Sequence, residues 1–453
     1  MEQLAGFPCI AIATNKSGSP AGDAAVDAVV ASLQPSGVSD VIVMVHGFRN
    51  SDAEARALYE QFLATFRVHL ESGRFPQLAQ RTIAVVSVFW PSKSFKEMPE
   101  LTRSAEGGTL TVRDDAVEDA ATAYALDALE RFAEEQPDNA ADVRAATAAL
   151  MHTPHDPALQ DELLSVLLAR LGTSDDDVAE GLTALRSRAG HEVVASLAVP
   201  IILPLAHHGA EGGTAVLGST GTSADARGEA LFIGSLFRSI RGRVGQLLNM
   251  GTWYTMKQRA GDVGVHTVAP LVRAIARTPR VPRVHLVGHS LGGRVMASAA
   301  ATLAGTPPVD SLLLLQAAFS HYGLAATVPG REGAGAFRAA VAPTRAVAGP
   351  FVATYSARDT VVGHVYAIAS RLAGDNYRAI GDARDAYGGI GRNGAQQTNE
   401  ARAIVLGDEM QHYALDYTGI VCVDGTPDDG ITHHSDVTNR RVTNLFAQMM
   451  AAT

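Results

Sequence analysis

Cysteine is scarce in this chain, and two such residues in 453 exclude a disulfide framework. Cys9 and Cys422 stand near opposite ends of the sequence and have no metal-ligand spacing, which argues against a zinc site as well. We expect both to be buried apolar residues. The first residues have neither a basic start nor an apolar stretch of signal-peptide length, so the expected location is the cytoplasm.

Excess positive charge is also missing. The net charge is −10, and residues 101–190 hold 7 Arg, no Lys and 18 Asp or Glu. An acidic surface repels nucleic acid, so we expect no nucleic-acid partner. The acidic stretch is either a solvated outer face or a surface that disfavours anionic substrates or docks a basic partner, and the sequence leaves both readings open.

No apolar run is long enough to cross a bilayer. The longest notable one, 193–206, has 14 residues and is broken by Pro200 and Pro204. A Gly, Ser and Thr-rich stretch, 209–228, follows and predicts a flexible loop. The apolar run is expected to pack in the interior, with an acyl pocket or a transient contact with a lipid surface as the alternatives.

What the chain does contain is a series of short apolar runs separated by helical patterns. This alternation is typical of an α/β protein with a mostly parallel sheet, because parallel neighbours need long crossover connections. A helix is predicted over 52–70, and a terminal helix over 439–450. The strands are predicted at 9–13, 41–45, 82–89, 283–287, 311–316, 351–356 and 420–423, those at 311–316 and 351–356 each followed by irregular sequence.

The distance between two of these strands indicates an insertion. Roughly 190 residues separate Phe89 from Arg283, far more than one crossover helix requires. The Ala-rich part of this stretch has Leu and Val at helical spacing and predicts several amphipathic helices. We therefore expect residues 1–95 and 255–453 to form the core, and 96–254 to form a mainly helical cap or lid.

The motif Gly288-His289-Ser290-Leu291-Gly292-Gly293 carries the strongest chemical signal. It follows an apolar strand and opens a helix-like stretch rich in Ala, Met and Arg. A serine on such a sharp turn presents its hydroxyl to a cleft, and the flanking glycines let strand and helix pass closely. Ser290 is the candidate nucleophile.

Acyl transfer to a serine also needs two N–H donors for the developing oxyanion. The residue after the nucleophile, Leu291, supplies the first. The second is expected from the loop His46-Gly47-Phe48-Arg49-Asn50, where Gly47 lets the backbone turn and Phe48 presents its N–H.

The hydroxyl further requires a base that is oriented by an acid. Asp359 follows a predicted strand and is the candidate acid. His434 is the candidate base and His433 the alternative, because both lie in a polar loop after the last predicted strand. The rival acids are Asp375, Asp385, Asp416 and Asp424, and the other histidines in the required order are His364 and His412.

Together these motifs resemble the α/β-hydrolase fold, and the elbow is similar to those of lipase- and esterase-like members. The resemblance covers roughly 7–95 and 255–453, and the His46-Gly47-Phe48 loop with Trp90-Pro91 resembles a bacterial group of undefined substrate. It implies a Ser290, Asp359, His434 triad, two-step acyl transfer and no metal or organic cofactor. The resemblance does not extend to the segment expected as a cap, so substrate specificity does not carry over.

The expected function is that of a serine hydrolase acting on carboxylic esters of small-molecule or acyl type. A serine peptidase or amidase uses the same constellation, and a non-catalytic binding protein that retains the fold is a further alternative. The physiological substrate, the acyl chain length and the oligomeric state are left open by the sequence.

Overall fold

The structure is a computed structural model of the 453-residue chain. It describes residues 2–22, 25–34, 37–92, 114–136, 140–174, 176–198, 201, 203, 238–305, 309–330, 332–374, 383–416 and 418–453. The predicted loop 209–228, the rival acid Asp375 and much of the apolar run 193–206 lie outside the described residues.

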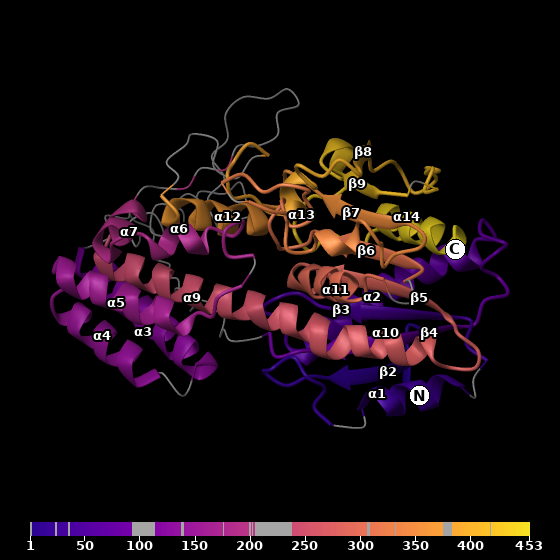
Figure 1. Ribbon diagram of the computed structural model, residues 1–453, viewed down its shortest axis with the longest axis horizontal. Helices are drawn as coiled ribbons and strands as arrows, with labels where there is room; N and C mark the ends of the chain where they lie inside the picture. The colour runs from indigo at the N-terminus through magenta and orange to yellow at the C-terminus, as the bar shows by residue number, and fades with distance from the viewer. Residues whose placement is uncertain are drawn as a thin grey trace, which may run out of the picture. The chain divides into compact units, whose positions relative to one another are not determined.

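A nine-stranded sheet with the order β1-β2-β4-β3-β5-β6-β7-β9-β8 forms the centre of the fold (Figure 1). Every neighbouring pair is parallel except β1 and β2. The prediction of an α/β protein with a mostly parallel sheet is therefore confirmed. The strands are β1 Glu2–Leu4, β2 Phe7–Ala13, β3 Asp40–Val45, β4 Ile83–Phe89, β5 Arg283–His289, β6 Ser311–Leu315, β7 Phe351–Tyr355, β8 Ala401–Val405 and β9 Ile420–Asp424.

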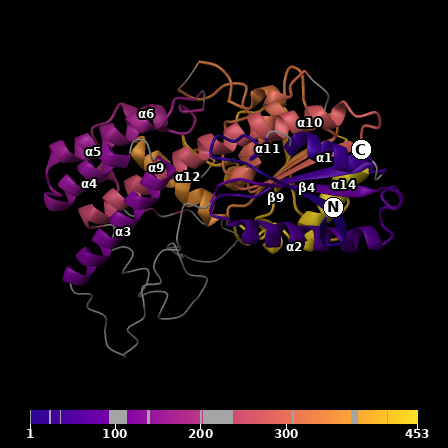
Figure 2. The same ribbon diagram turned by 90° about the horizontal axis from the view of Figure 1, so that it is seen from below.

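Helices cover both faces of this sheet. Two of them, α2 (Asp52–Glu71) and α14 (Arg440–Ala451), pack together on one face, and α10 (Ala269–Ala276) and α11 (Leu291–Thr302) lie with α1 (Ala25–Leu33) on the other (Figure 2). Because both faces are covered, the central strands are apolar throughout, and every residue of β3 and β4 is buried. The short helix α13 (Ile390–Asn393) completes this part, with a π-helical turn at Gly264–Val268.

Three features differ from the sequence prediction. The sequence after β7 was expected to be irregular, but only four residues separate the end of this strand from α12 (Thr360–Leu372). The edge strands β1 and β8 were not predicted. β1 has only three residues, and the partly exposed β8 has an arginine among its apolar residues, so neither shows the continuous apolar pattern of a central strand.

The chain divides into two compact units. The first comprises Met1–Lys93, Lys257–Tyr366 and Gly381–Thr453 and contains the sheet. The second comprises Ser94–Met256 and Ala367–Ile380. A cap role for residues 96–254 remains a prediction.

The described part of the second unit is helical. Its helices are α3 Asp114–Glu135, α4 Ala140–His152, α5 Pro157–Arg170, α6 Leu182–Arg186, α7 Gly190–Ser196, most of α9 Ile240–Val263 and the C-terminal part of α12. Several of its carboxylates form ion pairs, as between Glu130 and Arg144 at 2.7 Å, and between Glu118 and Arg241 at 2.7 Å. Part of the acidic charge noted in the sequence is thus neutralised within this unit.

In the described part of the apolar run beginning at Val193, the large side chains Val193, Val194, Leu197 and Leu203 are buried, whereas Ala195 is exposed. Val193 and Val194 belong to α7, and Leu203 packs against Ala367 within the second unit. The buried residues of this run therefore pack in the interior of the second unit. Among the residues described, no helix combines the length and apolar character needed to cross a bilayer. Cys9 and Cys422 are both buried and unpaired, as predicted.

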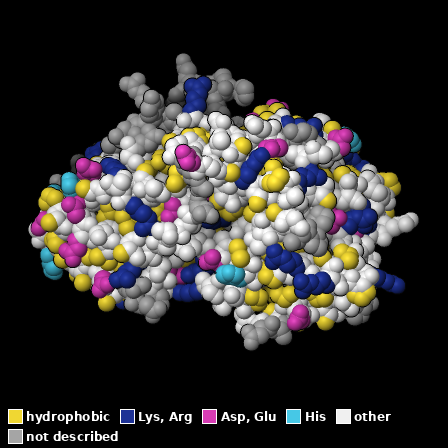
Figure 3. All heavy atoms as spheres, in the orientation of Figure 1, with side chains coloured by type: hydrophobic (Ala, Val, Ile, Leu, Met, Phe, Trp, Pro, Cys, Tyr) yellow, Lys and Arg dark blue, Asp and Glu magenta, His cyan; other side chains and the backbone are white. Residues whose placement is uncertain are grey.

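The surface charge of the sheet-containing unit is mixed, but one stretch is basic. Residues 273–283 hold four Arg and no Asp or Glu, and dark blue side chains gather over α10 in Figure 3. Two of these arginines donate to main-chain oxygens, Arg273 to Thr302 at 2.7 Å and Arg283 to Thr453 at 3.0 Å. Half of this small cluster thus stabilises the fold itself, and the absence of a nucleic-acid partner stays a prediction.

Candidate active site

Ser290 occupies the turn between β5 and α11. Its backbone has φ 58° and ψ −124°, a conformation that side-chain-bearing residues rarely adopt and that costs roughly 1–3 kcal/mol. A Cβ at Gly288 would lie 2.3 Å from the main-chain oxygen of Gly292, so only glycine allows the strand and helix to pass this closely. The turn thus has the strained geometry that the sequence motif predicts for a nucleophile.

The predicted oxyanion loop lies directly beside this serine. A Cβ at Gly47 would stand 2.5 Å from Ser290 Cβ and 3.1 Å from its Oγ, so a side chain cannot be accommodated there. As the first residue of α11, Leu291 has an N–H without a partner from its own helix. The loop of Phe48 and the N-terminus of α11 are therefore brought together at the serine hydroxyl.

His46 holds the loop in one conformation. It is fully buried, its Nε2 accepts a hydrogen bond from the Trp90 N–H at 3.2 Å, and the Trp90 indole donates to the His46 carbonyl at 2.9 Å. With Nε2 as acceptor, the neutral ring donates from Nδ1 to the Gly47 carbonyl at 2.9 Å. In a trans peptide the next N–H points the opposite way, so this bond turns the Phe48 N–H away from His46.

Asp359 and His434, the candidate acid and base from the sequence, lie within hydrogen-bond distance of each other. His434 Nδ1 lies 2.7 Å from Asp359 Oδ2, and the Asp359 side chain is fully buried. The other carboxylate oxygen, Oδ1, accepts the N–H of Val362 at 2.9 Å in the first turn of α12. One carboxylate therefore caps a helix and fixes the imidazole, because an ionised carboxylate can only accept hydrogen bonds and Nδ1 must then carry the hydrogen.

The loop carrying His434 is fixed by local hydrogen bonds. Ser356 Oγ donates to the Ile431 carbonyl at 2.8 Å, and Asn439, the N-cap of α14, donates to the Gly430 carbonyl at 3.0 Å. His434 is one-eighth exposed, and its ring packs on that of His289 with 4.8 Å between centroids. Since His289 precedes Ser290, the candidate base lies next to the turn of the candidate nucleophile.

The alternatives from the sequence lie differently. His433 is exposed, and its Nδ1 is 2.9 Å from Thr432 Oγ1. Asp385 is buried but accepts the Tyr387 N–H, and Asp424 accepts that of Thr426. The remaining candidates are Asp416 and His412, both exposed, and His364, half-buried on α12.

The contact that would complete the proton relay is not formed. Among the described residues, neither Ser290 Oγ nor His434 Nε2 makes a hydrogen bond to another residue. Catalytic hydrogen bonds are often long in resting structures and shorten when substrate binds. Nε2 therefore remains the nitrogen available to accept a proton.

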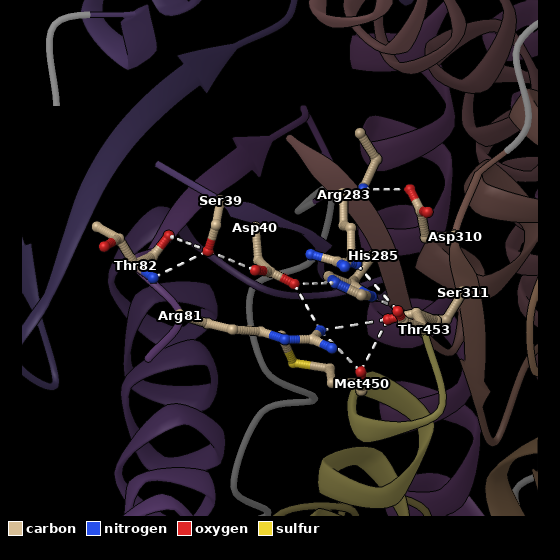
Figure 4. A network of polar contacts seen from close by, with 11 residues as sticks. Ser39, Asp40, Arg81, Thr82, Arg283, His285, Asp310, Ser311, Met450 and Thr453 are labelled. Atoms are coloured by element: carbon tan, nitrogen blue, oxygen red, sulfur yellow. Dashed lines mark hydrogen bonds and ion pairs between the residues drawn. The ribbon is translucent and has the colours of Figure 1, made fainter. Parts of the chain in front are cut away.

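A second Ser, His and Asp array lies at the opposite, amino-terminal edge of the sheet (Figure 4). His285 Nε2 is 3.0 Å from Asp40 Oδ1 and its Nδ1 is 2.8 Å from Ser311 Oγ. All three residues are fully buried, so no substrate can reach this hydroxyl. Arg81 joins Asp40, at 2.9 Å, to the carbonyl of Met450 at the end of α14, at 2.8 Å.

The electrostatics of this array agree with a structural role. Burial alone would raise the pKa of the Asp40 carboxyl, but the hydrogen bonds from His285 and Ser39, with the charges of His285 and Arg81, lower it overall. The carboxylate is therefore the anion at the centre of the network, and the sequence pattern gave no sign of it.

We expect Asp40→Asn to lower the free energy of unfolding by about 3–5 kcal/mol, because it leaves the largely buried cation of Arg81 without its anion. Asp310→Asn is the matched control, since Asp310 lies at the same edge and, among the described residues, its side chain accepts only the Val284 N–H, at 2.8 Å, which an amide oxygen can also accept. Urea unfolding measures both. Equal, small losses in the two variants would refute a central role for Asp40.

Four histidines are predicted to make the fold sensitive to acid. Burial lowers the pKa of His46 and His364 to about 4, and that of His289 and His321 to about 3. In the unfolded chain these histidines have the ordinary pKa of about 6.5. Because their pKa values in the folded protein are lower, the unfolded state binds more protons at mildly acidic pH. Stability is therefore complete above about pH 6.5 and is lost progressively as the pH falls toward 4.

Thermal melting between pH 7.5 and 5 measures this loss. The melting temperature should fall on acidification, and His321→Gln should show a weaker dependence because it removes one of the four groups. A melting temperature that is constant or rises between pH 7.5 and 5 would contradict the assignment of these histidines as neutral in the folded state.

Two observations bear on cofactors and relatives. Within the described ranges, His, Cys, Asp and Glu side chains form no group of three or more that could hold a metal ion. Comparison with known proteins gave no match, since no protein-family model, curated protein or solved structure is significantly similar to this chain.

Proposed function

We propose that this protein is a serine hydrolase that cleaves carboxylic esters, with Ser290 as nucleophile, His434 as base, and Asp359 as the acid that orients it. The observation that carries the proposal is the Asp359–His434 pair, at 2.7 Å, meeting the strained turn of Ser290 through the contact of His434 with His289. Residues more than 140 positions apart converge at the carboxyl edge of parallel strands, where active sites of such sheets form.

The α/β-hydrolase fold is part of the same proposal. Its support is the position of each group in the topology: the nucleophile follows β5, the acid follows β7 and the base follows β9, in the chain order of that fold. The oxyanion loop after β3, the strand next to β5, adds to this support.

In the proposed mechanism, His434 Nε2 takes the hydroxyl proton of Ser290 as Oγ attacks the ester carbonyl. The N–H groups of Phe48 and Leu291 donate to the resulting oxyanion, and the Asp359 carboxylate stabilises the imidazolium. The imidazolium then protonates the leaving alkoxide, and the alcohol departs. Water, deprotonated by His434, attacks the acyl-enzyme. The tetrahedral intermediate collapses, the bond to Oγ breaks, the imidazolium returns its proton to Ser290, and the carboxylic acid is released.

The experiment that tests this proposal compares two substrate types on the purified full chain. A series of p-nitrophenyl acyl esters should be hydrolysed, and peptide anilides should be left nearly untouched. Preferential cleavage of anilides would make the protein a peptidase or amidase. Failure of a fluorophosphonate to label Ser290, together with no turnover of either type, would leave a binding protein that retains the fold.

The proposed setting is the cytoplasm, with a small-molecule or acyl ester as the partner and no cofactor. The ester series also reports on acyl chain length. A preference for long chains would favour an apolar acyl site and transient contact with lipid surfaces.

A further inference from the structure

We propose that His289 is a positioning residue that holds His434 in register with Ser290. The inference rests on the proposed function and deepens it, because it assigns a second histidine to the same site. His289 is the last residue of β5 and is joined to Ser290 by a peptide bond, so any force that it exerts on His434 fixes the base relative to the nucleophile.

Two contacts connect the histidines. His289 Nε2 donates to the main-chain oxygen of His434 at 3.0 Å, because a carbonyl can only accept. The two rings pack with 4.8 Å between centroids and 41° between their planes. One contact fixes the backbone of the loop and the other restrains the plane of the imidazole.

These contacts complement the one made by Asp359. The carboxylate holds His434 at Nδ1, at 2.7 Å, while His289 holds its backbone and one ring face. Nε2 is the polar atom of the ring that none of these contacts occupies. The imidazole is thus restrained while its reactive nitrogen stays available.

The ionisation of His289 suits this role. It is 7% exposed, and burial, followed by the charge that His434 acquires on protonation, lowers the pKa of His289 to about 3. The ring therefore stays neutral while His434 accepts a proton beside it. A cationic neighbour at this distance would instead oppose the imidazolium that the reaction forms.

The Nδ1 atom of His289 indicates that this residue does more than fill space in the core. Its Nδ1 is buried without a hydrogen-bond partner among the described residues. The adjoining cavity is small, about 10 Å³, and its other walls are almost wholly apolar side chains such as Met44, Leu58 and Phe62. An unsatisfied buried acceptor costs about 1–3 kcal/mol, which an apolar residue would avoid, so the ring must contribute through Nε2 and its face.

The titratable groups around His289 come from three elements. His434 lies in the loop after β9, His46 follows β3, and Tyr59 on α2 lines the same cavity. Burial lowers the pKa of His46 to about 4 and raises that of Tyr59 well above its ordinary value, so both are neutral near pH 7. His434 is the group among them whose charge changes during the proposed reaction.

The test uses two substitutions that separate the contacts. His289→Phe keeps a ring and removes the donor. His289→Gln removes the ring but places an amide N–H donor the same number of bonds from the backbone as Nε2 of histidine. The second-order rate of Ser290 labelling by a fluorophosphonate should fall about 100-fold in the Phe variant, the usual effect of a misplacement near 1 Å. The Gln variant should restore most of that rate.

His69 supplies matched controls. It is buried on α2 and its Nε2 also contacts a main-chain oxygen, that of Arg440 at 3.0 Å, at the α2–α14 contact. His69→Phe and His69→Gln should change the melting temperature and leave the labelling rate of the folded protein unchanged. Wild-type labelling rates in both His289 variants would overturn the proposal while leaving the hydrolase assignment intact.

A second measurement does not depend on catalysis. Nitrogen-15 spectra of histidine-labelled wild-type protein should show His289 as the neutral Nε2–H tautomer from pH 5 to 8. If His289 gains a proton within that range, the positioning arrangement is wrong whether or not esters are cleaved. If His289 stays neutral but the wild type is not labelled at Ser290, the hydrolase proposal fails and the positioning role fails with it.

Discussion

Replacing Ser290 by Ala is expected to lower kcat for ester hydrolysis by about a million-fold, the loss seen when the nucleophile of a serine triad is removed. The rate should remain above that of the reaction in water, since the N–H groups of Phe48 and Leu291 still stabilise the oxyanion. Steady-state hydrolysis of a p-nitrophenyl ester measures the loss, with active-site titration used to exclude contaminating enzyme.

The fold should survive this substitution because Ala meets the same backbone strain at φ 58° that Ser does. Ser32→Ala is the matched control. Ser32 is exposed on α1, its hydroxyl donates to the Ala28 carbonyl at 2.8 Å, and its loss should leave turnover unchanged. Retention of more than a small part of the activity in the Ser290 variant would remove the nucleophile from the mechanism.

Asp359→Asn is expected to lower kcat at neutral pH by about 10⁴-fold. An asparagine can still accept the Val362 N–H with its oxygen, so the cap of α12 is kept. Its amide nitrogen then faces His434 Nδ1 and donates to it, which moves the imidazole hydrogen to Nε2. The base is then in the wrong tautomer to take the proton of Ser290.

This prediction distinguishes a positional effect from unfolding. The melting temperature of the Asn variant should stay close to that of the wild type, while turnover collapses. Asp385→Asn serves as the comparison, because Asp385 is, like Asp359, a buried carboxylate, and it was one of the rival acids in the sequence. If the Asp385 variant loses more activity per folded molecule than the Asp359 variant, the acid has been assigned to the wrong residue.

The repeating parts of the fold could be predicted because their signals are local. A buried parallel strand must be apolar along its whole length, and β3, β4 and β6 show this pattern directly. The turn at Ser290 could also be predicted, since Gly288 is required by a close approach to Gly292 within the same motif. Helix α12 was missed because its start depends on the Asp359 cap, whose side chain also serves the site.

Chain order and residue type alone determined that this is an α/β protein with a serine on a strand–helix turn, and they singled out Asp359 and His434. Which Ser, His and Asp side chains lie together at the candidate site was decided only by the tertiary structure. Ser311, His285 and Asp40 offer the same chemical groups as the candidate triad, but they are sealed at the opposite edge of the sheet. Packing determines which hydroxyl is accessible, and sequence spacing does not encode that accessibility. The same holds for His289, because its bond to the His434 carbonyl forms only when strands β5 and β9 lie in one sheet.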